Sequence, residues 1–488
     1  RLINMKFDDI RQFIDFLDHK GDLRRIKEKV SPELEITEIV DRVVKEQGPA
    51  LLFENVEDYD VPVLINVFGS HQRMAWALGV NNINEITDKV RGLLNLVEGP
   101  PEGFMNKINL LKNLFGIART KPNIISQAPC QEVVYLGSDA KFSILPALKC
   151  WPLDAGKYIT LPLVITKDLV TGRRNVGTYR MQIFDSSTAG MHWQTHKVGS
   201  QHYRQAEENK MNKIEVAISI GADPTTVWSG SLPIPPNMDE IVVSGILRGK
   251  SVSMVKCKTI DLEVPAYSEY VLEGYVIPGE LRDEGPFGDH TGYYSPKDEY
   301  PVFHLTAITH RKNPIYLTTI VGRPPSEDYY MGSASTKVLF PALQMTLPEI
   351  VDINMPAEGA FHNILIVSIK KAYPGHARKV MYALWGLGLL MLTKTIIVLD
   401  SYVNVHDMSE VAWRVATNIN PSTDLVMVEG PADDLDHATT TPKYGSKIGL
   451  DATTKGKKDG RSKEWPDEII MQEDIKNLVT KKWDNYRI

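Results

Sequence analysis

The stretch FHLTAITHRKNPIYLTTI, residues 303–320, decides how the middle of the chain is expected to fold. Apolar and polar residues alternate through its first half, and Ile315 to Ile320 is a second run of strand-forming residues. The turn residues Lys312-Asn313-Pro314 separate the two runs, so the pattern predicts a β-hairpin. Residues 121–325 hold many further short strand patterns between Gly and Pro, which predicts a β-rich domain built as a barrel or sandwich.

The regions on either side have α/β patterns. Residues 1–120 begin with apolar residues at helical spacing from Ile10 to Leu17, followed by a second helix pattern and two short strands. Residues 326–488 alternate strand and helix patterns between Ile364 and Val428, in β-α-β-α-β order, which predicts a parallel sheet buried on both faces. The tail from about Ala432 is polar and basic, and we expect it to wrap outward and support an oligomer.

Composition and charge exclude several classes of protein. The 488 residues are 43% hydrophobic and 24% charged, and 55 basic against 61 acidic residues give a net charge of −6. Positively and negatively charged residues are interspersed along the chain. The sequence therefore has no basic stripe that could bind a phosphate backbone, and no nucleic-acid partner is expected. The three cysteines, Cys130, Cys150 and Cys257, form no CxxC, which predicts neither a disulfide framework nor a zinc site of the usual spacing.

The sequence predicts a cytoplasmic protein. Its first residues lack an apolar stretch followed by a small-residue cleavage site, which argues against export. The most apolar run, Tyr382 to Leu392, is shorter than the roughly 20 residues that span a bilayer, although a peripheral membrane contact stays open. Neither a Gly-x-Ser-x-Gly elbow nor a Gly-x-Gly-x-x-Gly fingerprint occurs, so serine-hydrolase and Rossmann dinucleotide sites are not expected.

The segment from Ile277 to Pro301 is the first candidate functional region. Its glycines and prolines predict an irregular loop, and its charged residues argue against simple burial. Glu284 and Asp289 lie five residues apart in this loop. In a closed site two acids push each other's pKa apart, so one would hold a proton near neutrality while the other stays ionised beside a cation such as Arg180. The alternative is a solvated loop whose acids face water.

A second candidate region offers ligands for a cation. Asn175 lies five residues before Arg180, and His192 follows twelve residues later. An amide oxygen, an imidazole and a carboxylate make a mixed ligand set that suits Mn²⁺ or Mg²⁺ better than zinc. Glu240 follows a stiff proline-rich turn at the start of an apolar helix, and this position suits cation or phosphate ligation. An ordinary hairpin and a proline-rich connector are the structural alternatives.

Four motifs carry a family resemblance: Asn175-x-Gly-x-Tyr-Arg180, Glu284-Gly-Pro-Phe-Gly-Asp-His-Thr-Gly-Tyr-Tyr294, Gly322-Arg-Pro-Pro325 and Gly445-Ser-Lys-Ile-Gly-Leu-Asp451. With them the sequence resembles the UbiD decarboxylase family, particularly its 3-polyprenyl-4-hydroxybenzoate carboxy-lyases of ubiquinone biosynthesis. The resemblance covers nearly the whole chain from Met5. It implies a central flavin-binding split β-barrel between an N-terminal α/β domain and a C-terminal α/β oligomerisation domain.

The resemblance also implies the cofactors and the residues that hold them. Members of the family use prenylated FMN with Mn²⁺ and, as a further ion, K⁺. By motif, the Mn²⁺ ligands are Asn175, His192 and Glu240. The residues that contact the cofactor are Asn175, Thr178, Tyr179, Arg180, His192, Trp193, Gln194, Lys197, Val198 and Glu240, with Lys447 as a phosphate contact. The catalytic network is Arg180, Glu284 and Asp289.

The reaction implied by the resemblance is the reversible, non-oxidative decarboxylation of an aromatic acid. Loss of CO₂ from an sp² carbon leaves an in-plane carbanion, so an electron sink must bond to that carbon, and no amino-acid side chain offers one. We expect Asp289 to donate the proton, Arg180 to orient the substrate carboxylate, and Glu284 to support the cofactor and the proton network.

Three functions stay open on the sequence. The first is decarboxylation of a 3-polyprenyl-4-hydroxybenzoate in quinone biosynthesis, and the second is UbiD-type decarboxylation of another aryl or α,β-unsaturated acid. The third is a flavin-binding assembly protein without turnover. The expected partners are the aromatic acid, a flavin prenyltransferase that supplies the cofactor, and further copies of the chain in a dimer or hexamer. A lipid-tailed substrate would bring the protein to the membrane surface.

Overall fold

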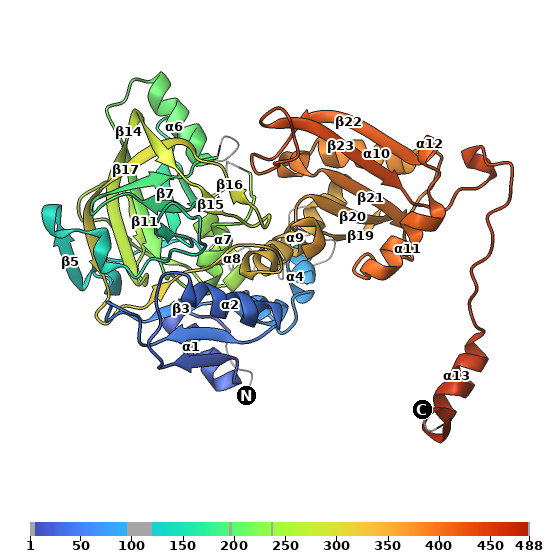
Figure 1. Cartoon of the computed structure of the whole chain (residues 1–488), viewed down its shortest axis with the longest axis horizontal. Coiled ribbons are helices and arrows are strands. Elements are labelled where there is room, and N and C mark those ends of the chain that lie inside the picture. Colours follow the sequence, from blue (N-terminus) through green and yellow to red (C-terminus); the bar gives the residue numbers. More distant parts are fainter. Residues whose placement is uncertain (1–4, 95–119, 195–197, 236–237, 487–488) are drawn as a thin grey trace, which may run out of the picture.

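The computed structural model describes residues 5–94, 120–194, 198–235 and 238–486. Three larger sheets of four, nine and five strands organise these residues. In Figure 1 the four- and nine-stranded sheets lie on one side of the molecule and the five-stranded sheet on the other, with helix α9 (Glu327–Thr346) between them. The predicted fold class is confirmed, because a curled sheet occupies the middle of the chain and α/β regions precede and follow it (Figure 1).

The N-terminal region is a small sheet with helices packed on it. Its strands are β1 (Leu23–Ile26), β2 (Ala50–Phe53) and β3 (Val63–Ile65), and its helices are α1 (Ile10–Lys20), α2 (Glu35–Lys45), α3 (His71–Ala77) and α4 (Glu85–Leu94). Helix α1 ends at Gly21, which has the left-handed φ of 72° that ends many helices. The predicted apolar stripe of α1 is buried at Phe13 and Leu17.

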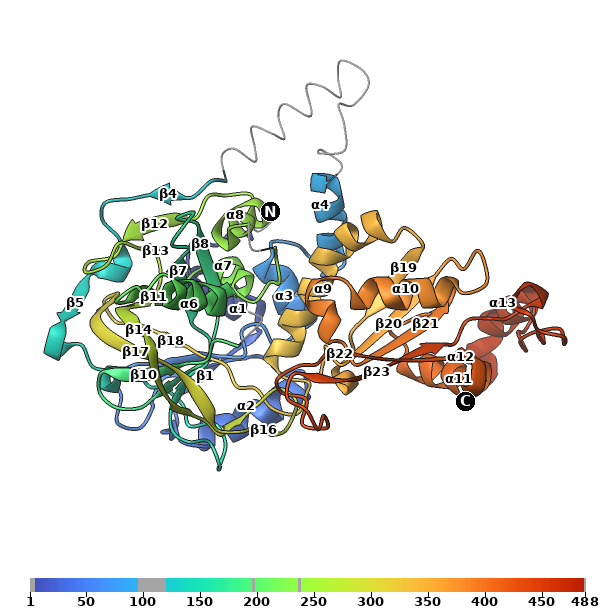
Figure 2. The ribbon, with the colours of Figure 1, turned by 90° about the horizontal axis from the view of Figure 1, so that it is seen from above.

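The central sheet has the strand order β6-β9-β10-β17-β14-β11-β7-β8, with β5 paired to β17. Its strands are β5 (Val133–Leu136), β6 (Tyr158–Ile159), β7 (Leu163–Lys167), β8 (Arg174–Thr178), β9 (Met181–Ile183), β10 (Thr188–Met191), β11 (Ile214–Ile220), β14 (Tyr270–Glu284) and β17 (Asp298–His310). Figure 2 shows the curl of this sheet from above. The helices of this region are α6 (Val198–Glu208), α7 (Pro224–Ser229) and α8 (Glu240–Arg248), of which α6 and α8 both pack on β8.

Two smaller sheets complete the central region. One has the order β13-β12-β4, and the other is the pair β15-β16. Their strands are β4 (Asn123–Ile124), β12 (Ser253–Lys256), β13 (Glu263–Pro265), β15 (Phe287–Gly288) and β16 (Tyr294–Ser295). The β15-β16 pair lies in the segment that the sequence marks as functional, so it shapes the loop described below.

The hairpin predicted from residues 303–320 is wrong. β17 pairs with β14 and β10 instead, and β18 (Tyr316–Leu317) leaves the central sheet to pair in parallel with β3. The connection is anchored by buried Glu269, whose carboxylate accepts from the Ile315 amide at 2.9 Å and lies 3.5 Å from Arg311. Local alternation predicts strands but not their partners, because a charge network assembled from distant parts of the chain holds the second strand elsewhere.

The segment from Ile277 to Pro301 is more regular than predicted. β14 continues to Glu284 and β17 begins at Asp298, so the two long strands extend into this segment as a pair. A bulge shifts their register around Gly279, which has a φ of 85°. The bulge accommodates the glycine and proline residues that, in the sequence, predict an irregular loop. Residues 285–297 leave the pairing and form the loop with β15 and β16.

The C-terminal sheet has the order β19-β20-β21-β23-β22. Its strands are β19 (Ile350–Asn354), β20 (Ile364–Ile369), β21 (Thr395–Asp400), β22 (Leu425–Pro431) and β23 (Tyr444–Asp451), and its helices are α10 (His376–Trp385), α11 (Met408–Asn418) and α12 (Pro421–Asp424). β20, β21 and β23 are parallel, whereas β19 and β22 run antiparallel to their neighbours. The predicted all-parallel sheet is therefore wrong: β22 and β23 form a hairpin, so part of the predicted tail becomes a strand beside β21.

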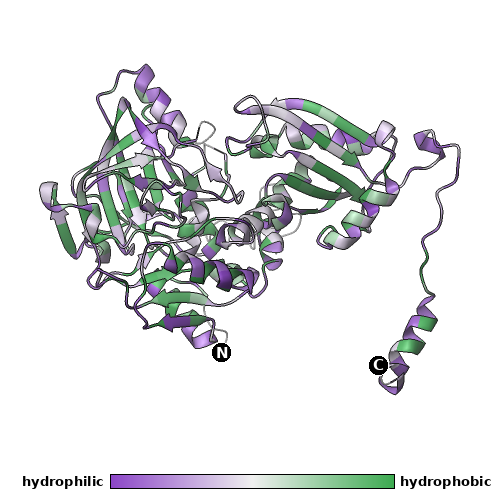
Figure 3. Ribbon diagram, viewed as in Figure 1, coloured by the Kyte–Doolittle hydropathy of each residue, from purple (hydrophilic) through white to green (hydrophobic). Residues whose placement is uncertain are grey.

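Both faces of the C-terminal sheet are buried at β20 and β21, as predicted, whereas the β22–β23 hairpin exposes alternate residues. Leu365 and Val367 belong to one apolar cluster, and Ile366 belongs to another. The apolar strands of this sheet stand out in Figure 3. A third and larger cluster runs from Phe7 to Val338 and joins the N-terminal region to the central one. Across the described ranges, the helices are all too short or too polar to cross a bilayer.

Candidate active site

The three predicted catalytic residues lie together at one end of the central sheet. Arg180 follows β8, Glu284 ends β14, and Asp289 lies in the loop after it. Arg180 Nε donates to Glu284 Oε1 at 2.9 Å and Nη2 donates to Oε2 at 3.1 Å, which is a bidentate pair. Arg180 Nη1 also donates to Asp289 Oδ2. Glu284 and Asp289 are buried and the Arg180 side chain is only 9% exposed, so the charges are compensated by one another more than by water.

The loop that carries Asp289 is shaped by contacts on its other side. Asp154 Oδ1 accepts from the Gly288 amide at 2.7 Å. A Cβ at position 288 would lie 2.2 Å from Cδ1 of Trp151, so only glycine fits against the indole. The Trp151 Nε1 in turn donates to the Val321 carbonyl at 2.8 Å. These contacts fix the backbone directly before Asp289.

Both acids of the network are held ionised. Burial raises the pKa of Glu284, but hydrogen bonds from His192 and Arg180 outweigh burial and lower this pKa to about 2. Burial also raises the pKa of Asp289, and the hydrogen bond from His290 together with the charge of Arg180 lowers it well below its usual range. The sequence predicts one protonated and one ionised acid. The structure differs because each carboxylate has two donors.

His192 connects this network to the predicted cofactor region. Its Nδ1 lies 3.1 Å from Glu284 Oε2, and its amide donates to the Arg180 carbonyl at 3.2 Å. Burial lowers the pKa of His192, so the neutral ring donates its Nδ1–H to Glu284 and keeps a lone pair on Nε2. A carboxylate that holds one ring nitrogen while the other is available is the usual arrangement of a metal-binding histidine.

Four buried polar atoms near the network make no hydrogen bond to the described protein. They are Asn175 Nδ2, Thr178 Oγ1, His192 Nε2 and Trp193 Nε1. A buried polar group without a partner costs about 1–3 kcal/mol, so four such atoms in adjacent segments indicate a place built for a bound group. All four belong to residues that the family resemblance assigns to the cofactor.

Glu240 begins α8 and faces β8. Its Oε2 accepts from the Val176 amide at 3.0 Å, next in sequence to Asn175. Burial raises the pKa of Glu240 to about 7, and a cation beside it would stabilise the ionised form. The described residues contain no group of three or more His, Cys, Asp and Glu side chains that forms a metal site, so a site here depends on the Asn175 amide as well. Such a donor set fits Mn²⁺.

The other predicted cofactor residues lie along β8 and between β10 and α6. Tyr179 is buried, and its hydroxyl accepts from the Gly199 amide at 3.4 Å. Trp193 is buried, whereas Gln194 and Val198 are half-buried. Tyr179 and Gln194 are next in sequence to residues that hold the unpartnered atoms, and Trp193 holds one of them, so these positions fit a bound group there.

The two remaining predicted contacts are Lys197 and Lys447. Lys197 lies outside the described residues. Lys447 lies within β23 of the C-terminal sheet, where its Nζ donates to the carbonyls of Met391 and Thr393. In the described parts of the chain, no hydrogen bond or ion pair joins Lys447 to the other predicted site residues, and its phosphate contact stays a prediction.

The geometry adds His290 and Ser295, which the sequence analysis missed. His290 Nδ1 lies 2.9 Å from Asp289 Oδ1, and Ser295 Oγ accepts from Arg180 Nη2 at 3.0 Å. His290 directly follows Asp289 in the glycine-rich motif, so its position beside a predicted catalytic acid could have identified it from the sequence. Ser295 reaches Arg180 through the register of β15 and β16, which spacing alone does not reveal.

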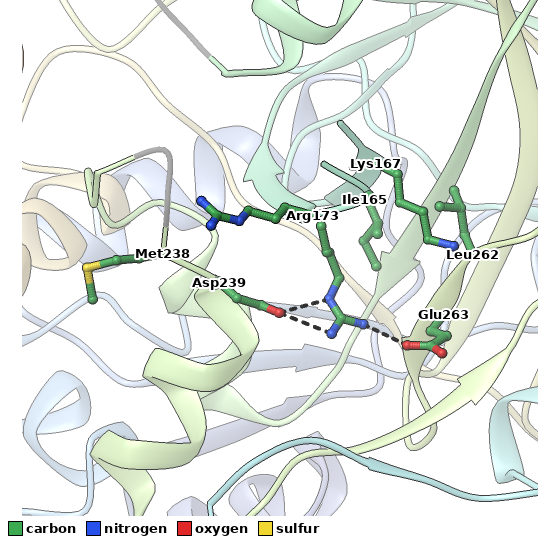
Figure 4. A pocket seen from close by; sticks show the side chains of 9 residues that line it. Ile165, Lys167, Arg173, Met238, Asp239, Leu262 and Glu263 are labelled. Atoms are coloured by element: carbon green, nitrogen blue, oxygen red, sulfur yellow. Dashed lines mark hydrogen bonds and ion pairs between the residues drawn. The ribbon is translucent and has the colours of Figure 1, made fainter. Parts of the chain in front are cut away.

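A pocket of about 340 Å³ lies beside the candidate cation ligands. Its charged lining residues are Lys167, Arg173, Arg174, Asp239 and Glu263 (Figure 4). Arg174 donates to Asp239 Oδ2 and to Glu263 Oε2, both at 3.1 Å. The lining includes sequence neighbours of Asn175 and Glu240 but none of the three catalytic residues, so this pocket is not where the network would meet a substrate.

Three family models match most of the chain. They describe the N-terminal, Rift-related and C-terminal domains of 3-octaprenyl-4-hydroxybenzoate carboxy-lyase and match residues 14–90, 123–324 and 329–452. The chain belongs to the UbiD family. An uncharacterized protein of Archaeoglobus fulgidus is 49% identical to it over 484 residues, 99% of each chain. The family resemblance of the sequence is thereby confirmed.

Solved structures of UbiD-class enzymes share the fold of this UbiD family member. The vanillic acid decarboxylase of Sedimentibacter hydroxybenzoicus in closed form has a TM-score of 0.86 and 28% identity over 99% of both chains. An evolved dimeric form of the UbiD-class enzyme HmfF from Pelotomaculum thermopropionicum, in complex with prenylated FMN, has a TM-score of 0.78 and 27% identity. That match covers 96% of this chain and 98% of the other.

Proposed function

We propose that this protein is a prenylated-FMN-dependent carboxy-lyase that removes CO₂ from an aromatic acid in a reversible, non-oxidative reaction. The observation that carries the proposal is the buried network of Arg180, Glu284 and Asp289 beside four buried polar atoms without a protein partner. Membership of the UbiD family supports it. Similarity to a vanillic acid decarboxylase and to an enzyme that holds prenylated FMN supports both the reaction and the cofactor.

The residues of the network divide the work of the reaction. The bound flavin supplies the electron sink that the substrate carbon needs when CO₂ leaves. Arg180 orients the substrate carboxylate and keeps Glu284 ionised, while Glu284 fixes the ring of His192. Asp289 delivers a proton to the carbon that has lost CO₂. Because the network is buried, its charges act in a medium of low dielectric and need little rearrangement during the reaction.

The proposed metal is Mn²⁺, held by Asn175, His192 and Glu240, with K⁺ as a further ion. Elemental analysis of the purified protein is expected to find manganese, and Glu240→Ala is expected to lose the metal and the flavin together. Glu263→Ala is the matched control, because Glu263 lines the neighbouring pocket and pairs with Arg174. Stoichiometric zinc, with activity unchanged by added Mn²⁺, would contradict the assignment.

The proposed substrate is a 3-polyprenyl-4-hydroxybenzoate of quinone biosynthesis. The second candidate is an aryl acid without a tail, which the similarity to a vanillic acid decarboxylase favours. CO₂ release from 4-hydroxybenzoates with and without a 3-prenyl tail separates the two. A kcat/KM that rises with tail length supports the first, whereas turnover of the untailed acids alone supports the second.

The deciding experiment is to produce the chain together with a flavin prenyltransferase, the proposed supplier of the cofactor. The purified protein is expected to show a bound-flavin spectrum, and mass spectrometry of the released cofactor is expected to give the mass of prenylated FMN. Solvent deuterium should then enter the product at the carbon that carried the carboxylate. A protein that binds the flavin but neither releases CO₂ nor exchanges deuterium with any tested acid would be an assembly protein instead.

The proposed division of the chain is 1–120, 121–325 and 326–488, with the flavin in the middle part and an oligomer-forming role for the last. Family matches over 14–90, 123–324 and 329–452 support this division. We propose a dimer or hexamer as the working form, and similarity to a dimeric HmfF supports an oligomer.

A further inference from the structure

Asp289 has a second partner besides Arg180. Its Oδ1 accepts from the His290 amide at 2.8 Å and lies 2.9 Å from His290 Nδ1. Its Oδ2 accepts from Arg180. Since the carboxylate is ionised, the proton of the Asp289–His290 contact lies on Nδ1. The acid proposed to protonate the substrate therefore holds no proton of its own, and the nearest one is on His290.

The other side of the His290 ring meets a histidine from the C-terminal region. His290 Nε2 lies 2.8 Å from His362 Nε2, and the two rings stand edge to face at 67°. A hydrogen bond needs one donor and one acceptor, so only one of the two Nε2 atoms carries a proton. When His290 is a cation, it donates from Nδ1 to Asp289 and from Nε2 to His362, and its ring is fixed at both ends.

His362 is held in place by an unusual backbone. Ala360 and Phe361, the two residues before it, have φ values of 48° and 45°, a region that side-chain-bearing residues rarely adopt. The Phe361 ring lies 5.3 Å from the His290 ring and packs against Gly332 of α9. The turn that presents His362 to His290 is therefore fixed by packing.

The groups that face His290 favour its charged form. They are Asp289 in the same loop, Asp328 at the start of α9, and Asp433 after β22. Arg180 lies across Asp289 and opposes them. Burial lowers the pKa of His290, but the hydrogen bond to Asp289 and the three carboxylates outweigh burial, so this pKa is raised.

We propose that His290 supplies Asp289 with the proton that Asp289 delivers to the substrate, and that His362 is the positioning residue that holds the His290 ring for this transfer. The inference rests on the proposed function. The His290 Nδ1–H bond breaks and an Asp289 Oδ1–H bond forms, so an ion pair becomes a neutral acid and a neutral imidazole. Asp289 then gives the proton to the carbon and is again a carboxylate.

The proton balance of the reaction requires such a supply. A carboxylate that leaves as CO₂ is replaced by hydrogen, so each turnover consumes one proton. Neutral His290 regains its proton from solvent water or hydronium, which are the co-reactants of the cycle. Because Asp289 is held ionised by Arg180, the rate at which it becomes an acid depends on the donor beside it.

The test uses the flavin-loaded full chain with His290→Gln, His362→Leu and His362→Gln. His290→Gln is expected to slow CO₂ release and deuterium entry into the product by about 10²-fold or more, with the bound-flavin spectrum kept. His362→Leu is expected to lower the pKa of His290, measured at that residue by histidine hydrogen–deuterium exchange mass spectrometry. The alkaline limb of the kcat/KM profile should move to lower pH with it, because His290 then loses its proton earlier.

Two variants separate positioning from general damage. His362→Gln keeps a hydrogen-bonding side chain and is expected to restore most of the pKa and the rate. His406→Leu is the matched control, because it makes the same substitution at another histidine of the C-terminal region, which is exposed and pairs with Asp352 at 2.9 Å instead of with His290. It should change neither quantity.

The outcomes are distinguishable from failure of the proposed function. An unchanged His290 pKa and an unchanged alkaline limb in His362→Leu would overturn the role of His362, and normal deuterium entry in His290→Gln would overturn the role of His290. If the loaded wild type releases CO₂ from no tested acid, the proposed function fails instead. The substrate-free His290 pKa in His362→Leu then still decides whether His362 holds the charged ring.

Discussion

Arg180 is the residue on which the charges of the site depend. Burial lowers its pKa, but Asp289 and Glu284 raise it more, so the guanidinium stays charged without water. Its plane lies over the Phe287 ring, 4.4 Å from the centroid, and three of its nitrogens face different acceptors. A lysine, with one compact ammonium, cannot make these contacts together. The motifs predict which residues form this site, but the ionisation of the acids follows only from distances.

The first prediction concerns Asp289→Asn. The two side chains are nearly isosteric, so the loop fixed by Asp154 and Gly288 should keep its shape and the flavin should still bind. The amide cannot take up a proton and pass it to the substrate carbon, so CO₂ release and solvent-deuterium entry into the product should both fall by about 10²- to 10⁴-fold. Near-normal exchange would make Asp289 structural, and loss of the flavin would make the loop a cofactor clamp.

A pH-dependent prediction follows from Asp328, which is buried at the start of α9. Its Oδ1 accepts from the Tyr329 amide at 2.9 Å, whereas its Oδ2 makes no hydrogen bond to the described protein. Burial raises its pKa from 3.8 to about 7. Between pH 3.8 and about 7 the folded state therefore keeps a proton on Asp328 that the unfolded state has lost. The free energy of unfolding falls as the pH rises through this range, because the buried carboxyl must then become charged.

Asp328→Asn should remove this penalty. We expect the Tm of the variant to exceed that of the wild type by roughly 2 °C or more at pH 8, with a smaller difference at pH 5, where the wild-type carboxyl is protonated. Differential scanning calorimetry at both pH values measures it. Asp88→Asn is the control, because Asp88 is exposed and should give the same Tm difference at both pH values. A difference for Asp328→Asn that does not depend on pH would contradict the assignment.

At the scale of elements, the sequence predicts most helices and strands but not all of their partners. The helix stop at Gly21 and the two buried faces of β20 follow from local patterns. The partner of β18 depends on Glu269, and the place of β23 depends on the hairpin with β22, so both require contacts between distant segments. Periodicity therefore identifies the helices and strands, whereas buried charges and contacts between distant segments decide which strands pair.

The bulge at Gly279 provides an element-scale prediction. Gly279 has a φ of 85° and Gly92 lies within α4, and a Cβ at either position would meet nothing within 4 Å. The backbone conformation is therefore the main difference between them. Gly279→Ala should destabilise the protein by about 1 kcal/mol, and Gly92→Ala should stabilise it by about 0.5–1 kcal/mol. Chemical denaturation of both variants measures this, and a stabilising Gly279→Ala would show that the strands re-register without the bulge.

At the scale of the whole molecule, the apolar core is divided between the two halves, helix α9 contributes to both parts, and a polar contact crosses the division. One cluster joins the N-terminal and central regions, and separate clusters fill the two faces of the C-terminal sheet. His290 and His362 lie on opposite sides of this division and bind each other at 2.8 Å. The site is therefore complete only when the C-terminal region lies against the central loop, which makes the position of that region part of the chemistry.

The last prediction concerns the chain after β23, which runs away from the body to α13 (Glu473–Lys482) (Figure 1). Ion pairs hold this tail as far as Glu468: Lys455 pairs with Asp424, Asp459 with Lys371, and Glu468 with Arg414. Beyond Glu468, three consecutive apolar residues, Ile469, Ile470 and Met471, are exposed, which is unusual for a monomer. We expect these residues to pack against another copy of the chain. The proposed dimer or hexamer would therefore depend on this part of the tail.

Truncation after Glu468 tests this role of the tail, because it removes the exposed segment and keeps the ion pairs that hold the rest. Multi-angle light scattering should give a smaller assembly for the truncated chain than for the full chain, and Ile470→Asp should act in the same direction. Val170→Asp is the control, because Val170 is 79% exposed in the turn between β7 and β8 and should leave the mass unchanged. An unchanged mass after truncation would place the contact between copies on the body of the C-terminal region or on the part of the tail before Glu468, and the exposed segment after it would have no role in assembly.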